Sequence, residues 1–264
     1  MNFLLVGNSQ LACIKKVHDS NKNILGQHGS ASFYVTPGGP GPHFTVKNDL
    51  LVVNKKGINP NFPPRAYPEN TPSIPLGHYD AIVVSALGYV DGGFCYPNPI
   101  TRQGLLVEYG PKENGITQRP LSKICYRQVI ESTLVNQPGF LFLSDLRRNF
   151  AGTIIVQPFP LLANGIKDHP GWPLNQMYMD PLGAHRFFSE VRDEVLARIC
   201  NSLKVELLPY PNSKWRNNLF TPSEYMVASD GLHPSEEYAK LVLEQISKVL
   251  ASYTHKRAAD RVDS

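Results

Sequence analysis

The stretch Asn2-Phe3-Leu4-Leu5-Val6-Gly7-Asn8-Ser9 decides the fold. Its apolar residues, Phe3 to Val6, form an uninterrupted run that is short enough for a strand buried on both faces. Gly7 then permits a tight turn, and Asn8 tolerates turn dihedral angles that branched residues resist. The next segment, Leu11 to Val17, repeats apolar residues at helical spacing. The stretch therefore predicts a strand, a turn and a helix.

Ser9 is expected at the junction between this strand and this helix. The amides at a helix N-terminus stabilise negative charge, so this is a suitable position for a serine nucleophile. Serine is also a common N-cap residue, and an N-cap role explains the same position without any chemistry. The segment alone leaves both interpretations open.

A second motif near the other end of the chain, Asp230-Gly231-Leu232-His233, favours the nucleophile. An acid three residues before a histidine can hold one imidazole nitrogen while the other nitrogen points outward. A serine needs such a base, because its hydroxyl is a poor nucleophile until its proton is removed.

With these two motifs the chain resembles the SGNH (GDSL-type) hydrolase family. Gly7-Asn8-Ser9 occupies the position of the family's Gly-Asp-Ser block, and Asp230 to His233 occupies that of its Asp-x-x-His block. The resemblance implies a flavodoxin-like three-layer α/β/α sandwich with a central, mostly parallel five-stranded sheet. It also implies ester hydrolysis by a triad of Ser9, His233 and Asp230, without a metal or an organic cofactor.

The resemblance further implies an oxyanion hole. The Ser9 amide is one expected donor, and Gly39, in the loop after the second strand, is another. The family places an asparagine in a Gly-x-Asn-Asp turn after the third strand, whereas this chain has Gly88-Tyr89-Val90-Asp91. Because valine offers no side-chain donor, we expect a group at Gly88 or Tyr89, or the side chain of Asn8, to substitute.

Strand and helix patterns alternate along the rest of the chain, which favours a parallel sheet. The stretch Ser-Ala-Ser-Phe-Tyr-Val-Thr ending at Thr36 predicts the second strand, and Phe44 to Val53 predicts a hairpin. Later strands are expected at Tyr79–Ser85, Thr153–Pro160 and Val205–Pro209. Helices are expected at Pro120–Leu134, with Ile124 and Cys125 inward, at Ala184–Leu203 and at Glu236–Leu250.

These 264 residues fit one domain spanning residues 1–254. Irregular insertions are expected at about 44–75, including an excursion from Asn59 to Pro75, and at about 92–119, 163–182 and 211–228. A polar, frayed tail is expected at 255–264.

Composition excludes several classes of function. The net charge of +4 is not gathered into a basic stripe, so we expect neither nucleic-acid nor membrane-surface binding. The N-terminus shows no basic segment or cleavage site, and the four cysteines lack paired spacing, which together favour a cytoplasmic protein. His43, His78 and His185 have no metal-ligand spacing.

The leading hypothesis is a serine hydrolase of small carboxylic esters, with a small-molecule or glycan ester such as an O-acetyl sugar as substrate. Trp215 and Arg216 are candidate substrate-binding residues, although packing of a long loop explains the tryptophan equally well. Two alternatives remain: an O-acyltransferase that uses the same triad, and a catalytically silent carbohydrate-binding module on the same fold.

Overall fold

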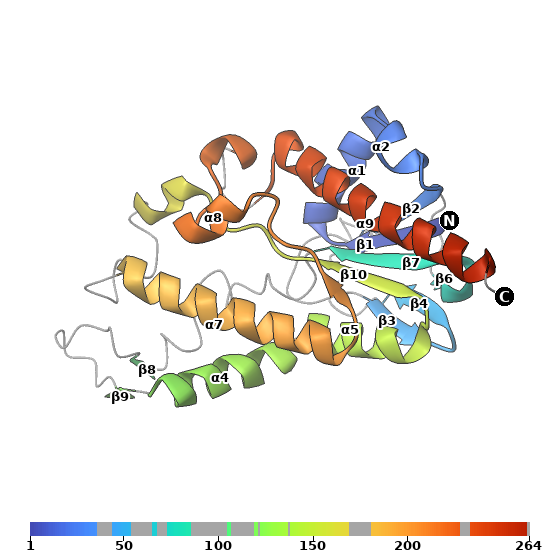
Figure 1. Cartoon of the computed structure of the whole chain (residues 1–264). Coiled ribbons are helices and arrows are strands. Elements are labelled where there is room, and N and C mark those ends of the chain that lie inside the picture. The colour runs from blue at the N-terminus through green and yellow to red at the C-terminus, as the bar shows by residue number, and fades with distance from the viewer. Residues whose placement is uncertain are drawn as a thin grey trace.

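A six-stranded sheet forms the centre of the molecule (Figure 1), in a computed structural model of the whole chain. The model describes residues 1–35, 44–53, 65–67, 73–85, 105–106, 119–120, 122–136, 138–168, 181–227 and 233–262. The strand order is β11-β10-β7-β1-β2-β5. The strands are β1 (Asn2–Gly7), β2 (Ser30–Val35), β5 (Arg65–Tyr67), β7 (Ala81–Ser85), β10 (Thr153–Gln157) and β11 (Glu206–Leu207).

Five of these strands are parallel, and β5 adds an antiparallel edge strand beside β2. Counted in chain order, the parallel strands lie in the order 2-1-3-4-5, which is the flavodoxin-like arrangement. The predicted fold class is confirmed, with the sixth strand as an addition. In this arrangement the strand order reverses beside β1, and ligands bind beyond the carboxyl ends of the strands at that point.

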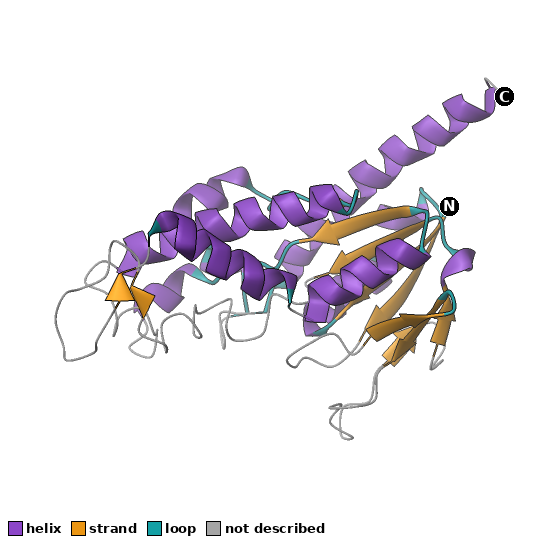
Figure 2. Cartoon of the chain, turned by 90° about the horizontal axis from the view of Figure 1, so that it is seen from below, coloured by secondary structure: helices purple, strands orange, loops and turns teal. Residues whose placement is uncertain are grey.

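Helices cover both faces of the sheet (Figure 1). One face carries α1 (Ser9–Ser20), α2 (Asn23–Gly26) and α9 (Glu236–Val262), and the other carries α4 (Lys123–Val135), α5 (Pro138–Asn149) and α7 (Pro181–Ser202). Shorter helices follow the strands: α8 (Ser213–Asn218), η1 (Leu76–His78), η2 (Asn164–Asp168) and η3 (Ser223–Tyr225). Figure 2 shows the last turns of α9 extending beyond the strands on the side of the N-terminus.

Alternate residues of each strand enter two separate cores, because successive side chains point to opposite faces of a sheet. In β1, Phe3 and Leu5 pack towards α1 and α9, whereas Leu4 and Val6 pack towards α5 and α7. A strand buried on both faces must be apolar at every position, which explains the uninterrupted run at the start of the chain.

The predicted hairpin is confirmed as part of a second, antiparallel sheet. Strands β3 (Phe44–Lys47) and β4 (Leu50–Val53) pair directly, and β6 (Ser73–Pro75) pairs with β4. The turn residues Asn48 and Asp49 have φ values of 51° and 61°, which the hairpin's right-handed twist favours.

Other predictions were wrong in detail. The excursion from Asn59 to Pro75 contains β5 and β6, and α5 was not anticipated. Helix α4 begins at Lys123 and leaves 71% of Ile124 exposed instead of facing the core. The expected frayed tail is helical as far as Val262. The 92–119 insertion lies mostly outside the described residues, apart from two-residue strands β8 (Leu105–Leu106) and β9 (Arg119–Pro120).

Gly7 is required by the close approach of neighbouring strands. A Cβ atom at this position would lie 2.8 Å from the Ser85 carbonyl oxygen and 2.8 Å from the Leu11 Cβ atom. We expect Gly7→Ala to lower the free energy of unfolding by about 1–3 kcal/mol, measured by urea denaturation. Gly26→Ala is the matched control, because nothing lies within 4 Å of its Cβ position. Equal effects of the two substitutions would contradict this account.

Candidate active site

Ser9 is the first residue of α1, directly beyond the carboxyl end of β1. The residue that caps the helix is Asn8, whose backbone is extended and whose side-chain oxygen accepts a hydrogen bond from the Gln10 amide at 3.1 Å. The interpretation of Ser9 as the N-cap is therefore wrong. Its hydroxyl is available for another partner.

His233 is held by backbone contacts on both sides of the 228–232 segment. The Val227 amide donates to the His233 carbonyl at 2.7 Å, and the Ser235 amide donates to the Tyr225 carbonyl at 2.9 Å. These bonds form a short antiparallel bridge between Met226 and Pro234. The backbone position of His233 is thereby fixed directly before α9 begins at Glu236.

Ser9 and His233 meet at the carboxyl edge of the sheet. Ser9 Oγ and His233 Nε2 lie 3.1 Å apart, across 224 positions of sequence. Both residues are partly exposed, so a ligand can reach them. A histidine at this distance can act as the general base for a serine hydroxyl.

Four of the predicted site residues lie outside the described residues. They are the acid of the triad and three of the expected oxyanion donors: Asp230, Gly39, Gly88 and Tyr89. Val90 lies outside as well, so the group that substitutes for the family's asparagine is not identified. The roles of these residues stay predictions.

The N-terminus of α1 supplies a favourable electrostatic environment beside Ser9. The Ser9 amide is at the first helical position, where a backbone N–H has no carbonyl four residues earlier to bond. The first turn of the helix contains no acidic residue that would neutralise its positive end. The Ser9 amide is therefore a suitable oxyanion donor.

Cys13 lies one turn after Ser9 on the same side of α1. Burial raises the pKa of its thiol, and the nearby Glu236 carboxylate raises it further. A protonated thiol is a poor nucleophile. Cys13 is therefore a poor candidate nucleophile, and the nucleophilic role predicted for Ser9 stays a prediction.

Trp215 lies in the core instead of at an exposed pocket wall. Only 4% of the residue is exposed, and its ring packs against Tyr225 at 4.7 Å and Tyr238 at 5.8 Å between ring centroids. This burial agrees with the packing alternative. Arg216 follows in α8, and its role in substrate binding stays a prediction.

A buried polar pair that the sequence did not indicate lies at the same edge of the sheet. Ser85 Oγ donates to Gln157 Oε1 at 2.7 Å, and only 1% and 2% of these residues are exposed. Ser85 is aligned with Gly7 on one side and with Gln157 on the other. The pair therefore joins the last residues of β7 and β10 beside the strand that leads to Ser9.

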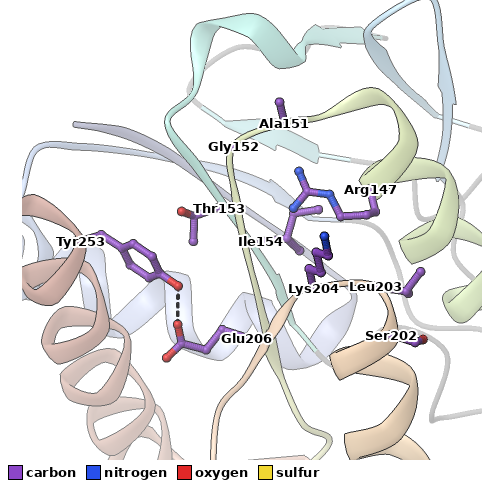
Figure 3. Close-up of a pocket in the computed structure, with 10 residues that line it drawn as sticks. All are labelled: Arg147, Ala151, Gly152, Thr153, Ile154, Ser202, Leu203, Lys204, Glu206 and Tyr253. Atoms are coloured by element: carbon purple, nitrogen blue, oxygen red, sulfur yellow. Dashed lines mark hydrogen bonds between the residues drawn. The ribbon is translucent and has the colours of Figure 1, made fainter. Parts of the chain in front are cut away.

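A pocket of about 730 Å³ lies at the opposite edge, by the amino end of β10 (Figure 3). Arg147 and Lys204 line one side, and Tyr253 donates to Glu206 at 2.6 Å on the other. Arg147 also donates to the Phe150 carbonyl just after α5, and Lys204 lies two residues beyond the end of α7. Cations at helix C-termini offset the negative ends of helix dipoles. Stabilisation of α5 and α7 therefore explains why Arg147 and Lys204 lie in this pocket.

The described ranges contain neither a metal-ligand cluster nor a membrane-spanning helix. No group of three or more His, Cys, Asp or Glu residues in them is placed to hold a metal ion. None of the helices they contain is both long and apolar enough to cross a membrane.

The chain is only weakly similar to known proteins. No family model matches the chain, and no curated protein matches it. Among solved structures, a candidate SGNH hydrolase from Slackia heliotrinireducens aligns at 13% identity and a TM-score of 0.41, covering 94% of this chain and 97% of that chain. A mutant of an acetyl-xylooligosaccharide esterase from Geobacillus aligns at 10% identity and a TM-score of 0.42, covering 94% and 93%.

Neither likeness carries an argument about the activity of this chain. The assignment of function therefore depends on the residues of this chain.

The Ser85–Gln157 pair provides a test of how the site edge is stabilised. We expect Gln157→Leu to lower the free energy of unfolding by about 1–3 kcal/mol, because the Ser85 hydroxyl is left buried without its acceptor. Adding Ser85→Ala should restore part of this loss, with a coupling energy of about 0.5–3 kcal/mol in a double-mutant cycle. Strictly additive effects in urea denaturation would show that the two side chains do not interact.

Proposed function

We propose that the protein is a serine hydrolase of small carboxylic esters. The observation that carries the proposal is the 3.1 Å distance between Ser9 Oγ and His233 Nε2 at the carboxyl edge of a parallel sheet. This edge, at the reversal of strand order, is where ligands bind in such folds. More specifically, we propose that the substrate is an O-acetylated carbohydrate.

In the first half of the reaction, Ser9 Oγ attacks the ester carbonyl carbon while His233 Nε2 accepts the hydroxyl proton. The carbonyl oxygen becomes an oxyanion, to which the Ser9 amide donates at the positive end of α1. The tetrahedral intermediate collapses when the bond to the alcohol oxygen breaks. His233 gives its proton to the departing alcohol, and an acyl group remains on Ser9.

In the second half, His233 removes a proton from water, and the hydroxide attacks the acyl carbonyl carbon. Collapse of this second intermediate returns the proton from His233 to Ser9 Oγ and releases the carboxylic acid. The role proposed for Asp230 is to hold the imidazole in the tautomer that leaves Nε2 free to accept a proton, and to stabilise the imidazolium that forms.

Ser9→Ala tests the nucleophile. We expect hydrolysis of p-nitrophenyl acetate to fall by about 10⁴-fold or more, and labelling by a fluorophosphonate probe to disappear. Ser20→Ala is the matched control, because Ser20 ends the same helix and its hydroxyl bonds only the Lys16 carbonyl. Equal hydrolysis rates for Ser9→Ala and the unmodified protein would remove the proposal.

Asp230→Asn tests the third member of the triad. The NH2 group of an asparagine can donate to Nδ1 and so favour the tautomer with its proton on Nε2, which cannot accept a proton from Ser9; we therefore expect kcat to fall by about 10³–10⁴-fold while KM changes little. Asp19→Asn, an exposed acid at the far end of α1, should leave kcat unchanged. A kcat for Asp230→Asn within about twofold of the unmodified protein would remove Asp230 from the triad.

A further inference from the structure

A second pocket, of about 390 Å³, lies on the side of the molecule that carries Ser9. Its polar lining consists of Asn164, Asn217, Asn218 and Arg186, and its apolar lining includes Leu182 and Phe220. No role was predicted from the sequence for any of these six residues.

The pocket belongs to the carboxyl edge of the sheet. Asn164 lies in the segment that leaves the carboxyl end of β10, and Asn217 and Asn218 lie in α8, which follows β11. The two segments are joined at Thr221, whose amide and hydroxyl donate to the Leu162 and Leu161 carbonyls, each at 2.8 Å. The pocket and Ser9 therefore lie beyond the same ends of the parallel strands.

The floor of the pocket is fixed by packing. The ring of Phe220 stacks on the buried His185, with 5.2 Å between centroids and 26° between planes. Burial, together with the charge of Arg192, lowers the pKa of His185 to about 4, so the stacked imidazole is neutral near pH 7. Leu219 is buried although its φ of 65° is unusual for a bulky residue, and it turns the chain directly after the two asparagines of α8.

The chemistry of the lining suits a ligand rich in hydroxyl groups. Each asparagine amide offers both donors and an acceptor, and arginine adds donors only. The three asparagines are exposed, and so is 47% of Leu182, which provides an apolar surface beside them. A sugar ring presents the matching surface, with hydroxyl groups at its rim and C–H groups on its face. Among the described residues, the lining holds no carboxylate that would have to be desolvated.

We infer that this pocket binds the sugar of an esterified carbohydrate whose acyl group reaches Ser9. The inference rests on the proposed function for its catalytic consequence, but sugar binding itself does not require a working nucleophile.

The first test compares two substrates in the variant Asn217→Ala/Asn218→Ala. We expect KM for acetylated cellobiose to rise about tenfold or more, since two hydrogen-bonding groups are lost, while kcat/KM for p-nitrophenyl acetate stays within about twofold. Asn164→Ala, on the other side of the pocket, should also raise KM for acetylated cellobiose. Asn201 is an exposed asparagine at the far end of α7. Asn201→Ala is therefore the matched control and should leave the kinetic constants for both substrates unchanged.

The second test separates this inference from the proposed function. Calorimetric titration of the Ser9→Ala protein with acetylated cellobiose should show binding that weakens about tenfold or more when Asn217→Ala/Asn218→Ala is added. Failure of Ser9→Ala to lower ester hydrolysis would remove the proposed function, and this titration would still decide the sugar site. An unchanged affinity and KM in the asparagine variants, or an equal loss on both substrates, would overturn the inference.

Discussion

The packing of α1 against α9 is the contact on which the candidate site depends. Ser9 begins the first of these helices and His233 lies three residues before the second, so their distance is set by how the helices meet on the sheet. Leu11, Ile14 and Val17 of α1 are buried in the same core as Val242, Leu243 and Ile246 of α9. Each such side chain contributes about 1.5–3 kcal/mol when fully buried. The ion pair between Lys16 and Glu236 contributes little beside this, because both side chains are exposed to solvent that screens their charges.

The sheet determines the edge of the molecule at which the contact between α1 and α9 brings Ser9 and His233 together. The chain runs from β1 through α1 to β2 on one side of β1, whereas the later strands β7, β10 and β11 lie on the other side, so the strand order reverses beside β1. Ser9, two residues beyond the end of β1, therefore lies at this reversal of strand order. Gly7 lets β1 and β7 approach closely at this end, and the Ser85–Gln157 bond joins the next pair of strand ends. The ends of β1, β7 and β10 are thus held close together at the site, and backbone bonds at Val227 and Ser235 fix the described chain on either side of residues 228–232.

The sequence predicted those features that depend on residues close together in the chain. The run from Phe3 to Val6 indicated a buried strand because both faces of β1 are covered, and the two catalytic motifs are each only a few residues long. What it missed depends on distant partners. Strands β5 and β6 have three residues each and exist through pairing with β2 and β4. The Ser85–Gln157 bond joins residues 72 positions apart, and no local pattern indicates it. The burial of Trp215 likewise follows from where α9 lies.

The asparagine that stands where the family resemblance implies an aspartate can be explained by the same geometry. Capping α1 requires an oxygen that accepts the Gln10 hydrogen bond, and Asn8 provides it as an aspartate would. The two residues differ in charge. An aspartate adjoining Ser9 would place a negative charge where the oxyanion is expected to form, and would offset the positive end of the helix. Asn8 keeps the cap and leaves that positive end available to the substrate. The substitution therefore preserves the structure of the turn and is compatible with catalysis at Ser9.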